Sequence, residues 1–103
     1  MLVELLKKTE IVKIDRLEVC WPVLQIILDN HSQFPNITGF HIEFDPKFFT
    51  LISRIADFYG PRLKYFSMVE AIVKYPKPKE YLTLAKLILS QSYNIKTLIL
   101  TPF

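Results

Sequence analysis

A short pattern of apolar residues recurs four times along the chain. In each copy the apolar side chains occupy the first, fourth and sixth positions. Alternation between apolar and other residues over a few positions is typical of a strand with one buried face. The sequence therefore predicts four strands, within residues 11–19, 37–42, 62–68 and 95–100. The copies are Ile14, Leu17 and Val19; Ile37, Phe40 and Ile42; Leu63, Phe66 and Met68; and Ile95, Leu98 and Leu100.

Stretches with apolar residues at helical spacing separate these strands. A short amphipathic helix is expected in residues 1–10, one helix opens at Pro22, another runs from Asp45-Pro46 to Gly60, and the last covers residues 79–90. An aspartate before a proline favours a helix start. Gly60 is expected to adopt the left-handed conformation that ends a helix, since the following proline prevents continuation.

The spacing of the copies predicts the fold. Their first positions are 14, 37, 63 and 95, so successive copies start 23, 26 and 32 residues apart. Units of about 20 to 29 residues with a Leu-x-x-Leu-x-Leu strand are the leucine-rich-repeat signature. Such units stack, with right-handed crossovers between parallel strands. We expect a single α/β domain over residues 1–103, a short solenoid with four parallel strands in sequential order and helices on one face.

The segments that lead into three of the strands also align with one another. These segments, residues 34–40, 60–66 and 92–98, resemble the Cys-Pro-Asn-Leu-x-x-Leu lead-in of the repeats in F-box/leucine-rich-repeat proteins. The resemblance spans residues 14–100 and implies a non-catalytic protein–protein interaction module that recognises substrates in an F-box-type ubiquitin ligase adaptor. The ninth motif position, usually Asn or Cys in that family, holds Pro22, Asp45, Ala71 and Phe103, and the sequence contains no F-box motif.

The third, fifth and seventh motif positions define a candidate binding surface. Because side chains alternate along a strand, the third, fifth and seventh positions face away from the helices, on the concave side of the sheet. Concave sheets are the usual binding surface of solenoids. The residues predicted to contact a protein partner are Arg16, Glu18, His41, Glu43, Tyr65 and Ser67. The alternative is that these side chains are merely solvated.

Charge and cysteine content narrow the class of protein. The net charge of +3 is scattered, apart from the basic segment 74–79, which reads as a solvated loop. A basic RNA-associated module is therefore the weakest interpretation, and nucleic acid is not an expected partner. A single cysteine rules out an intrachain disulfide and fits a cytoplasmic protein. No apolar run is long enough for a membrane span, and the N-terminal order of charges differs from that of a secretory signal.

The residues that could bind a metal, act as a nucleophile or form a phosphate loop are the histidines, the cysteine and the glycines. His41, Glu43 and Asp45 alternate, but zinc needs four ligands, so no metal is expected. Cys20 is expected to be a small buried side chain, and His31 a helix-capping residue. The sequence has glycine only at positions 39 and 60, so it contains no glycine-rich phosphate-binding loop. The sequence therefore predicts a protein without a cofactor and without enzymatic activity.

A second architecture fits the same elements. In a compact α/β regulatory or small enzyme domain with a doubly wound sheet, helices would cover both faces and the strand order would reverse at a switch point. In either fold the last strand would lie at the sheet edge. An exposed apolar edge invites association with a strand of another chain, or continuation in a longer protein.

Overall fold

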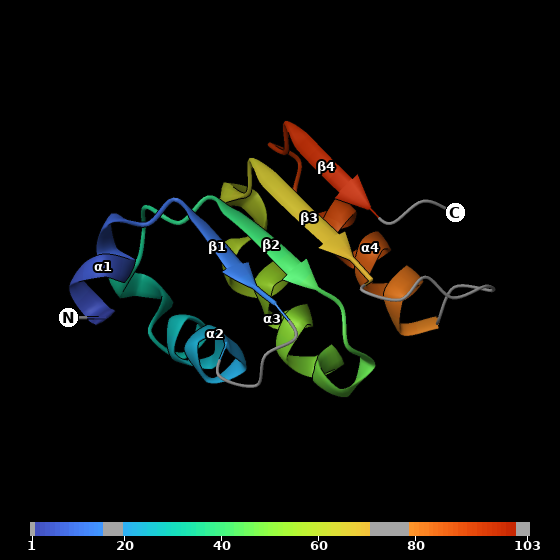
Figure 1. Ribbon diagram of the computed structural model, residues 1–103. Coiled ribbons are helices and arrows are strands. Elements are labelled where there is room, and N and C mark those ends of the chain that lie inside the picture. The colour runs from blue at the N-terminus through green and yellow to red at the C-terminus, as the bar shows by residue number, and fades with distance from the viewer. Residues whose placement is uncertain (1, 16–19, 71–78, 101–103) are drawn as a thin grey trace.

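The sheet contains four parallel strands in the order in which they occur in the sequence. The computed structural model describes residues 2–15, 20–70 and 79–100. The order β1-β2-β3-β4 (Figure 1) confirms the sequential arrangement and contradicts the doubly wound alternative, which requires a reversal. The strands are β1 (Ile11–Ile14), β2 (Gly39–Glu43), β3 (Tyr65–Val69) and β4 (Thr97–Leu100).

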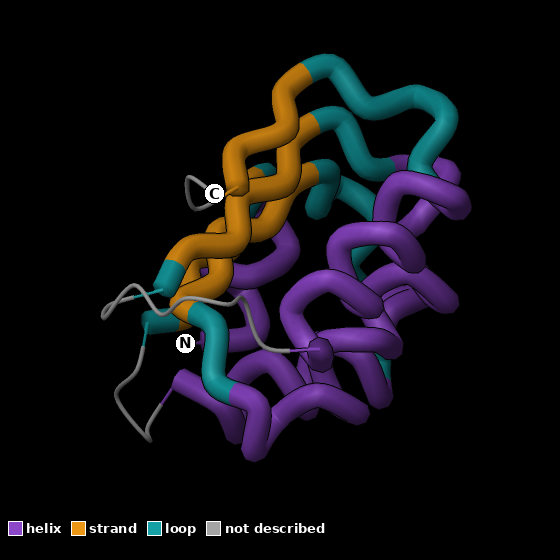
Figure 2. Tube along the Cα trace, turned by 90° about the vertical axis from the view of Figure 1, so that its right-hand side faces the viewer, coloured by secondary structure: helices purple, strands orange, loops and turns teal. Residues whose placement is uncertain are grey.

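The helices form one layer against one face of the sheet. Figure 2 shows the strands on one side of the molecule and the main helices on the other. Among the described elements, none covers the opposite face of the sheet, and α1 lies beside β1 (Figure 1). The helices are α1 (Leu2–Lys8), α2 (Cys20–Asp29), α3 (Phe49–Tyr59) and α4 (Lys79–Gln91), and short 3-10 turns η1, η2 and η3 cover His31–Gln33, Pro46–Phe48 and Gly60–Arg62.

The core lies between the two layers and repeats from one unit to the next. The fourth and sixth motif positions of β2 and β3 are fully buried, as the strand alternation predicts. Helices α3 and α4 bury residues at the same relative positions. In each helix one apolar stripe faces the core, and the two helices pack against each other. The buried residues of these helices are Ile52, Ile55, Ala56 and Tyr59 in α3, and Tyr81, Leu84, Ala85 and Ile88 in α4.

The same pattern of backbone hydrogen bonds joins each pair of neighbouring strands at their N-terminal ends. The carbonyl of Glu10 accepts hydrogen bonds from the amides of Thr38 and Gly39, at 2.8 and 3.0 Å. The Thr38 carbonyl accepts in the same way from Lys64 and Tyr65, at 2.8 and 3.3 Å. The Lys64 carbonyl then accepts from the amides of Lys96 and Thr97, at 2.8 and 3.0 Å. Each unit is therefore stacked on the preceding one in the same way.

The register of β1 differs from the sequence prediction. Val12 pairs with Phe40 and Ile14 with Ile42, so the first copy of the pattern begins at Thr9 rather than at Ile14. Residues 11–19 carry two apolar alternations that are out of step by one residue, and the sheet uses the first. The strand ends at Ile14, and residues 16–19 lie outside the described part of the chain.

The helix boundaries lie close to the sequence prediction, but α2 begins at Cys20, two residues before the predicted start at Pro22, and the conformation of Gly60 differs. Asp45 Oδ1 accepts the amide of Lys47 at 3.0 Å, which is the predicted cap, although a 3-10 turn precedes α3. Gly60 is right-handed, with φ of −41°, so the left-handed prediction is wrong. Glycine is needed there for space, because a Cβ atom would lie 2.8 Å from Gln91 Cβ. This close approach sets the spacing between α3 and α4.

Candidate protein-binding face

The outward-facing residues of the four strands form the face of the sheet that no described helix covers, here called the open face. The strand pairing aligns them in rows across the sheet. One row is Ile11, Gly39, Tyr65 and Thr97, the next is Lys13, His41, Ser67 and Ile99, and the last described pair is Glu43 and Val69.

Three of the six predicted contact residues are partly exposed on the open face. These are His41, Glu43 and Tyr65. Arg16 and Glu18 lie outside the described residues, and the rows in which they were expected begin instead with Ile11 and Lys13. The first apolar copy begins five residues earlier than predicted, so Ile11 and Lys13 take the positions expected for Arg16 and Glu18.

Ser67 occupies its predicted position but is not available for contact. Its side chain is only 1% exposed, although it points away from the helices. Strand alternation gives the direction of a side chain, whereas exposure also depends on the size of its neighbours. A serine between the longer side chains of neighbouring strands stays below the surface, so Ser67 offers little surface to a partner.

A shallow depression lies near the entry end of the open face. It has a volume of about 410 Å³ and is bounded by Ile11, Lys13, His41 and Tyr65. A Cβ atom on Gly39 would lie 3.0 Å from Tyr65 Cβ and 3.1 Å from Ile11 Cγ1. The absence of a side chain at Gly39 therefore lets its two neighbours approach each other across the middle strand.

The open face combines apolar and charged side chains. Ile11 and Ile99, at its two edges, are 46% and 44% exposed. Tyr65 lies between them, and Lys13 is next to His41 in the second row. Sheets with only parallel strands are almost always covered on both faces, because their residues are apolar on both sides. Ile11 and Ile99 are therefore apolar side chains left exposed on a parallel sheet whose outer face no described helix covers.

The candidate metal and nucleophile residues were His41, Glu43, Asp45 and Cys20. Within the described ranges, no three His, Cys, Asp or Glu side chains lie close enough to hold a metal ion, so His41, Glu43 and Asp45 form no such site. The Cys20 thiol donates a hydrogen bond to Asp15 Oδ1 at 3.2 Å. Burial, followed by this hydrogen bond, raises the pKa of Cys20. The protonated thiol is a poor nucleophile and a poor metal ligand.

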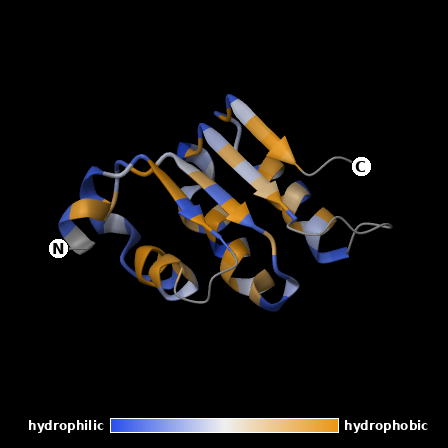
Figure 3. Ribbon diagram, in the orientation of Figure 1, coloured by the Kyte–Doolittle hydropathy of each residue, from blue (hydrophilic) through white to orange (hydrophobic). Residues whose placement is uncertain are grey.

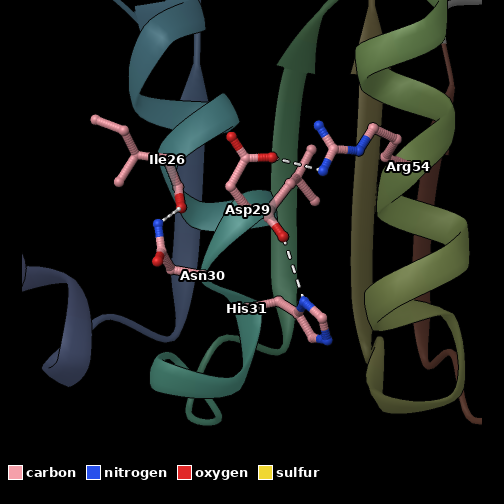
Figure 4. Close-up of polar contacts among 6 residues, drawn as sticks. Ile26, Asp29, Asn30, His31 and Arg54 are labelled. Atoms are coloured by element: carbon pink, nitrogen blue, oxygen red, sulfur yellow. Dashed lines mark hydrogen bonds and ion pairs between the residues drawn. The ribbon is translucent and has the colours of Figure 1, made fainter.

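His31 belongs to a set of contacts that join α2 to α3. Its Nδ1 lies 3.3 Å from the carbonyl oxygen of Leu28, and Arg54 Nη2 lies 2.7 Å from Asp29 Oδ1 (Figure 4). The imidazole also stacks on Phe58, with ring centroids 4.4 Å apart. The capping role predicted for His31 is therefore consistent with its contacts at the end of α2.

Two asparagines connect neighbouring units in a way that the sequence analysis did not anticipate. Asn36 Nδ2 donates to the carbonyl of Lys7 at 2.9 Å, and Asn94 Nδ2 donates to the carbonyl of Pro61 at 2.8 Å. Both asparagines directly precede the first motif position, and both acceptors occupy equivalent positions in the preceding unit. The shared Asn-Ile dipeptide was the available signal. This dipeptide indicates how the units align, but by itself it does not predict the hydrogen bond that each asparagine donates.

The chain was compared with known proteins, and no family model, curated protein or solved structure matches it. Within the described ranges, none of the helices has the length and apolar character that crossing a membrane requires.

Proposed function

We propose that this protein is a non-catalytic protein–protein interaction module whose open face binds a protein partner. The observation that carries the proposal is the uncovered parallel sheet, with Ile11 and Ile99 about half exposed and Tyr65 between them. Protein interfaces are enriched in aromatic side chains and have an apolar centre with a polar rim. Lys13, His41 and Glu43 supply polar groups around the apolar residues of this face.

The repeated junctions support the view that the module is a short leucine-rich-repeat solenoid. Each carbonyl at the second motif position accepts two amides of the next unit, as expected for units that stack in one direction. The lead-in segments further suggest substrate recognition in an F-box-type ubiquitin ligase adaptor, and a cytoplasmic location belongs to the same proposal. The support for this setting is the resemblance of those segments alone.

The experiment is a quantitative affinity capture with the wild-type chain and two variants. Tyr65→Glu and Ile99→Glu, combined, place two carboxylates on the open face, where burial against a partner would leave them unpaired. The matched control is Ile26→Glu, because Ile26 is 41% exposed on α2, away from the sheet. We expect proteins captured by the wild type to be lost from the double variant and retained by the control.

The result must be separated from a loss of folding. Circular dichroism and thermal unfolding of all three chains serve this purpose, since both altered side chains are at least partly exposed. Identical sets of captured proteins for the wild type and a folded double variant would show that the open face is not the binding surface. Charge reversal at Glu43, by Glu43→Lys, then measures the contribution of the polar rim to affinity.

A further inference from the structure

A groove on the helical side of the molecule lies between α2 and α3. It has a volume of about 620 Å³ and is open to solvent. Trp21 and Gln25 contribute from α2, Lys47 and Phe48 from η2, and Leu51 and Arg54 from α3. The groove lies on the helical layer and not on the open face, so an inference about it does not depend on the function proposed above.

The floor of the groove is apolar and rigidly packed. The indole of Trp21 is only 3% exposed and stacks on Phe48, with ring centroids 4.2 Å apart and an interplanar angle of 11°. Leu51 is partly exposed beside them. The partly exposed surfaces of Phe48 and Leu51 favour apolar side chains of a ligand, because contact removes both partners from water.

Two cationic side chains line the same groove. Lys47 Nζ lies 5.6 Å from the centroid of the Phe48 ring. The Arg54 guanidinium is oriented by its 2.7 Å contact with Asp29 and by the Phe58 ring, whose centroid is 5.3 Å away. A guanidinium has five N–H donors, so this ion pair leaves donors available for a second acceptor. Among the described side chains that line the groove, none is a carboxylate.

The spacing of the two cations defines the ligand that would match them. Lys47 and Arg54 are seven residues apart along η2 and α3, so their backbone positions are separated by a distance on the order of 10 Å along the helix. An extended peptide covers about 10 Å with three residue steps. Glutamate and lysine side chains are long and flexible, so two acidic residues three positions apart could reach both cations, with an apolar residue between them over the aromatic floor.

We propose that this groove binds an acidic peptide segment of a protein partner, with apolar residues between two carboxylates. The arguments are the charge of the lining residues and the apolar floor beneath them. An open groove between helices also suits an extended or helical segment, which makes side-chain contacts along its length.

The test uses the only tryptophan of the chain as the reporter. Trp21 lines the groove and stacks on the partly exposed Phe48, so we expect a peptide bound over Phe48 to change the fluorescence of Trp21. The probes are the acetylated and amidated peptides Gly-Glu-Leu-Leu-Glu-Gly and Gly-Lys-Leu-Leu-Lys-Gly, neither of which contains an aromatic residue. We expect the acidic peptide to give a saturable change and to bind about tenfold more tightly than the basic one, since two exposed charge contacts are reversed.

A matched pair of variants locates the site. Lys47→Glu removes one cation of the groove, whereas Lys86→Glu makes the same charge change at an exposed position on α4. We expect Lys47→Glu to weaken binding of the acidic peptide several-fold and Lys86→Glu to leave it unchanged, with the difference decreasing as salt is added. Equal loss in the two variants would show that only the net charge of the protein matters, and would overturn the proposal.

Three other outcomes would also overturn it. The first is no change in Trp21 fluorescence with the acidic peptide, and the second is equal binding of the two peptides. The third is a saturable change with sodium octanoate and none with the acidic peptide, which would assign the groove to a small anionic amphiphile.

Discussion

At the scale of single residues, buried tyrosine hydroxyls link helices to the strands and loops beneath them. The Tyr81 hydroxyl donates to the carbonyl of Met68 at 2.6 Å, and both residues are fully buried. Tyr81→Phe removes this bond without changing the packing, and we expect it to lower the free energy of unfolding by about 1 to 2 kcal/mol. Urea denaturation measures the change. Tyr93→Phe is the control because Tyr93 is 76% exposed, and an equal effect of the two changes would contradict the assignment.

The Cys20 thiol provides a second test at the same scale. Its pKa is raised, mainly by burial and next by the hydrogen bond to Asp15. A raised pKa lowers the fraction of thiolate at any pH below it. We therefore expect the midpoint of the pH dependence of alkylation by iodoacetamide to lie above that of N-acetylcysteine.

The midpoint of this alkylation profile is independent of how accessible the sulfur is. Asp15→Asn removes a nearby negative charge and should lower the midpoint, because Coulombic repulsion by Asp15 also raises the pKa of Cys20. Asp29→Asn, on the exposed end of α2, should leave the midpoint unchanged. A wild-type midpoint at or below that of N-acetylcysteine would contradict the protonated state assigned to Cys20.

At the scale of the elements, the spacing of α3 and α4 depends on Gly60. Its backbone is right-handed, so alanine could adopt the same conformation without strain. An alanine of this kind normally stabilises a protein by about 0.4 to 1 kcal/mol through the unfolded chain. Here the new Cβ would lie 2.8 Å from Gln91 Cβ and 3.0 Å from the Gln91 carbonyl oxygen.

We therefore expect Gly60→Ala to destabilise the protein, by about 1 to 3 kcal/mol, as in other overpacked sites. The sign of the change is the test, and the midpoint of thermal or urea unfolding measures it. The double change Gly60→Ala with Gln91→Gly removes the nearest atom and should recover part of the loss. A more stable Gly60→Ala variant would show that the close approach of α3 and α4 does not require glycine at this position.

The elements also show what the sequence could and could not predict. The helices and the last three strands follow from periodicity, because each carries one clear alternation or one apolar stripe. The register of β1 could not be predicted in this way, since residues 11–19 fit two alternations and the choice depends on the carbonyl of Glu10 and on β2. The exposure of Ser67 and the contact made by Gly60 likewise depend on side chains that are distant in sequence.

At the scale of the whole molecule, the open face and the groove differ in how far the sequence could predict them. The open face was anticipated from strand alternation, although its first strand was assigned to the wrong residues. The groove was not anticipated, because the stacking of Trp21 on Phe48 is a contact between residues that are distant in sequence. Periodicity identifies which side of an element is buried, but it does not identify which elements leave a gap between them.

The two ends of the stack of units also differ in how well their apolar residues are covered. Leu6 of α1 is buried beside the first unit, whereas Leu98 and Leu100 of β4 are only partly buried. The equivalent residues of β2 and β3 are fully buried. Figure 3 shows that β4 is hydrophobic along most of its length.

Helix α4 extends this apolar end of the molecule. Gln91 contacts Gly60 beside α3, and by helical spacing Leu82 and Leu89 lie on the side of α4 that faces away from α3. Both leucines are exposed, at 37% and 47%. An edge strand beside an exposed apolar helix face is a template for pairing with another chain, so we expect the purified protein to associate as its concentration rises.

Light scattering during size-exclusion chromatography, over a hundredfold range of concentration, measures this association. Leu82→Lys with Leu89→Lys should shift the average mass towards that of the monomer, because two charges would be buried at the contact between chains. Ile26→Lys is the control, as Ile26 is exposed to a similar extent on α2, away from β4. A wild-type chain that stays monomeric throughout, or an equal effect of the control, would show that this end of the molecule does not associate.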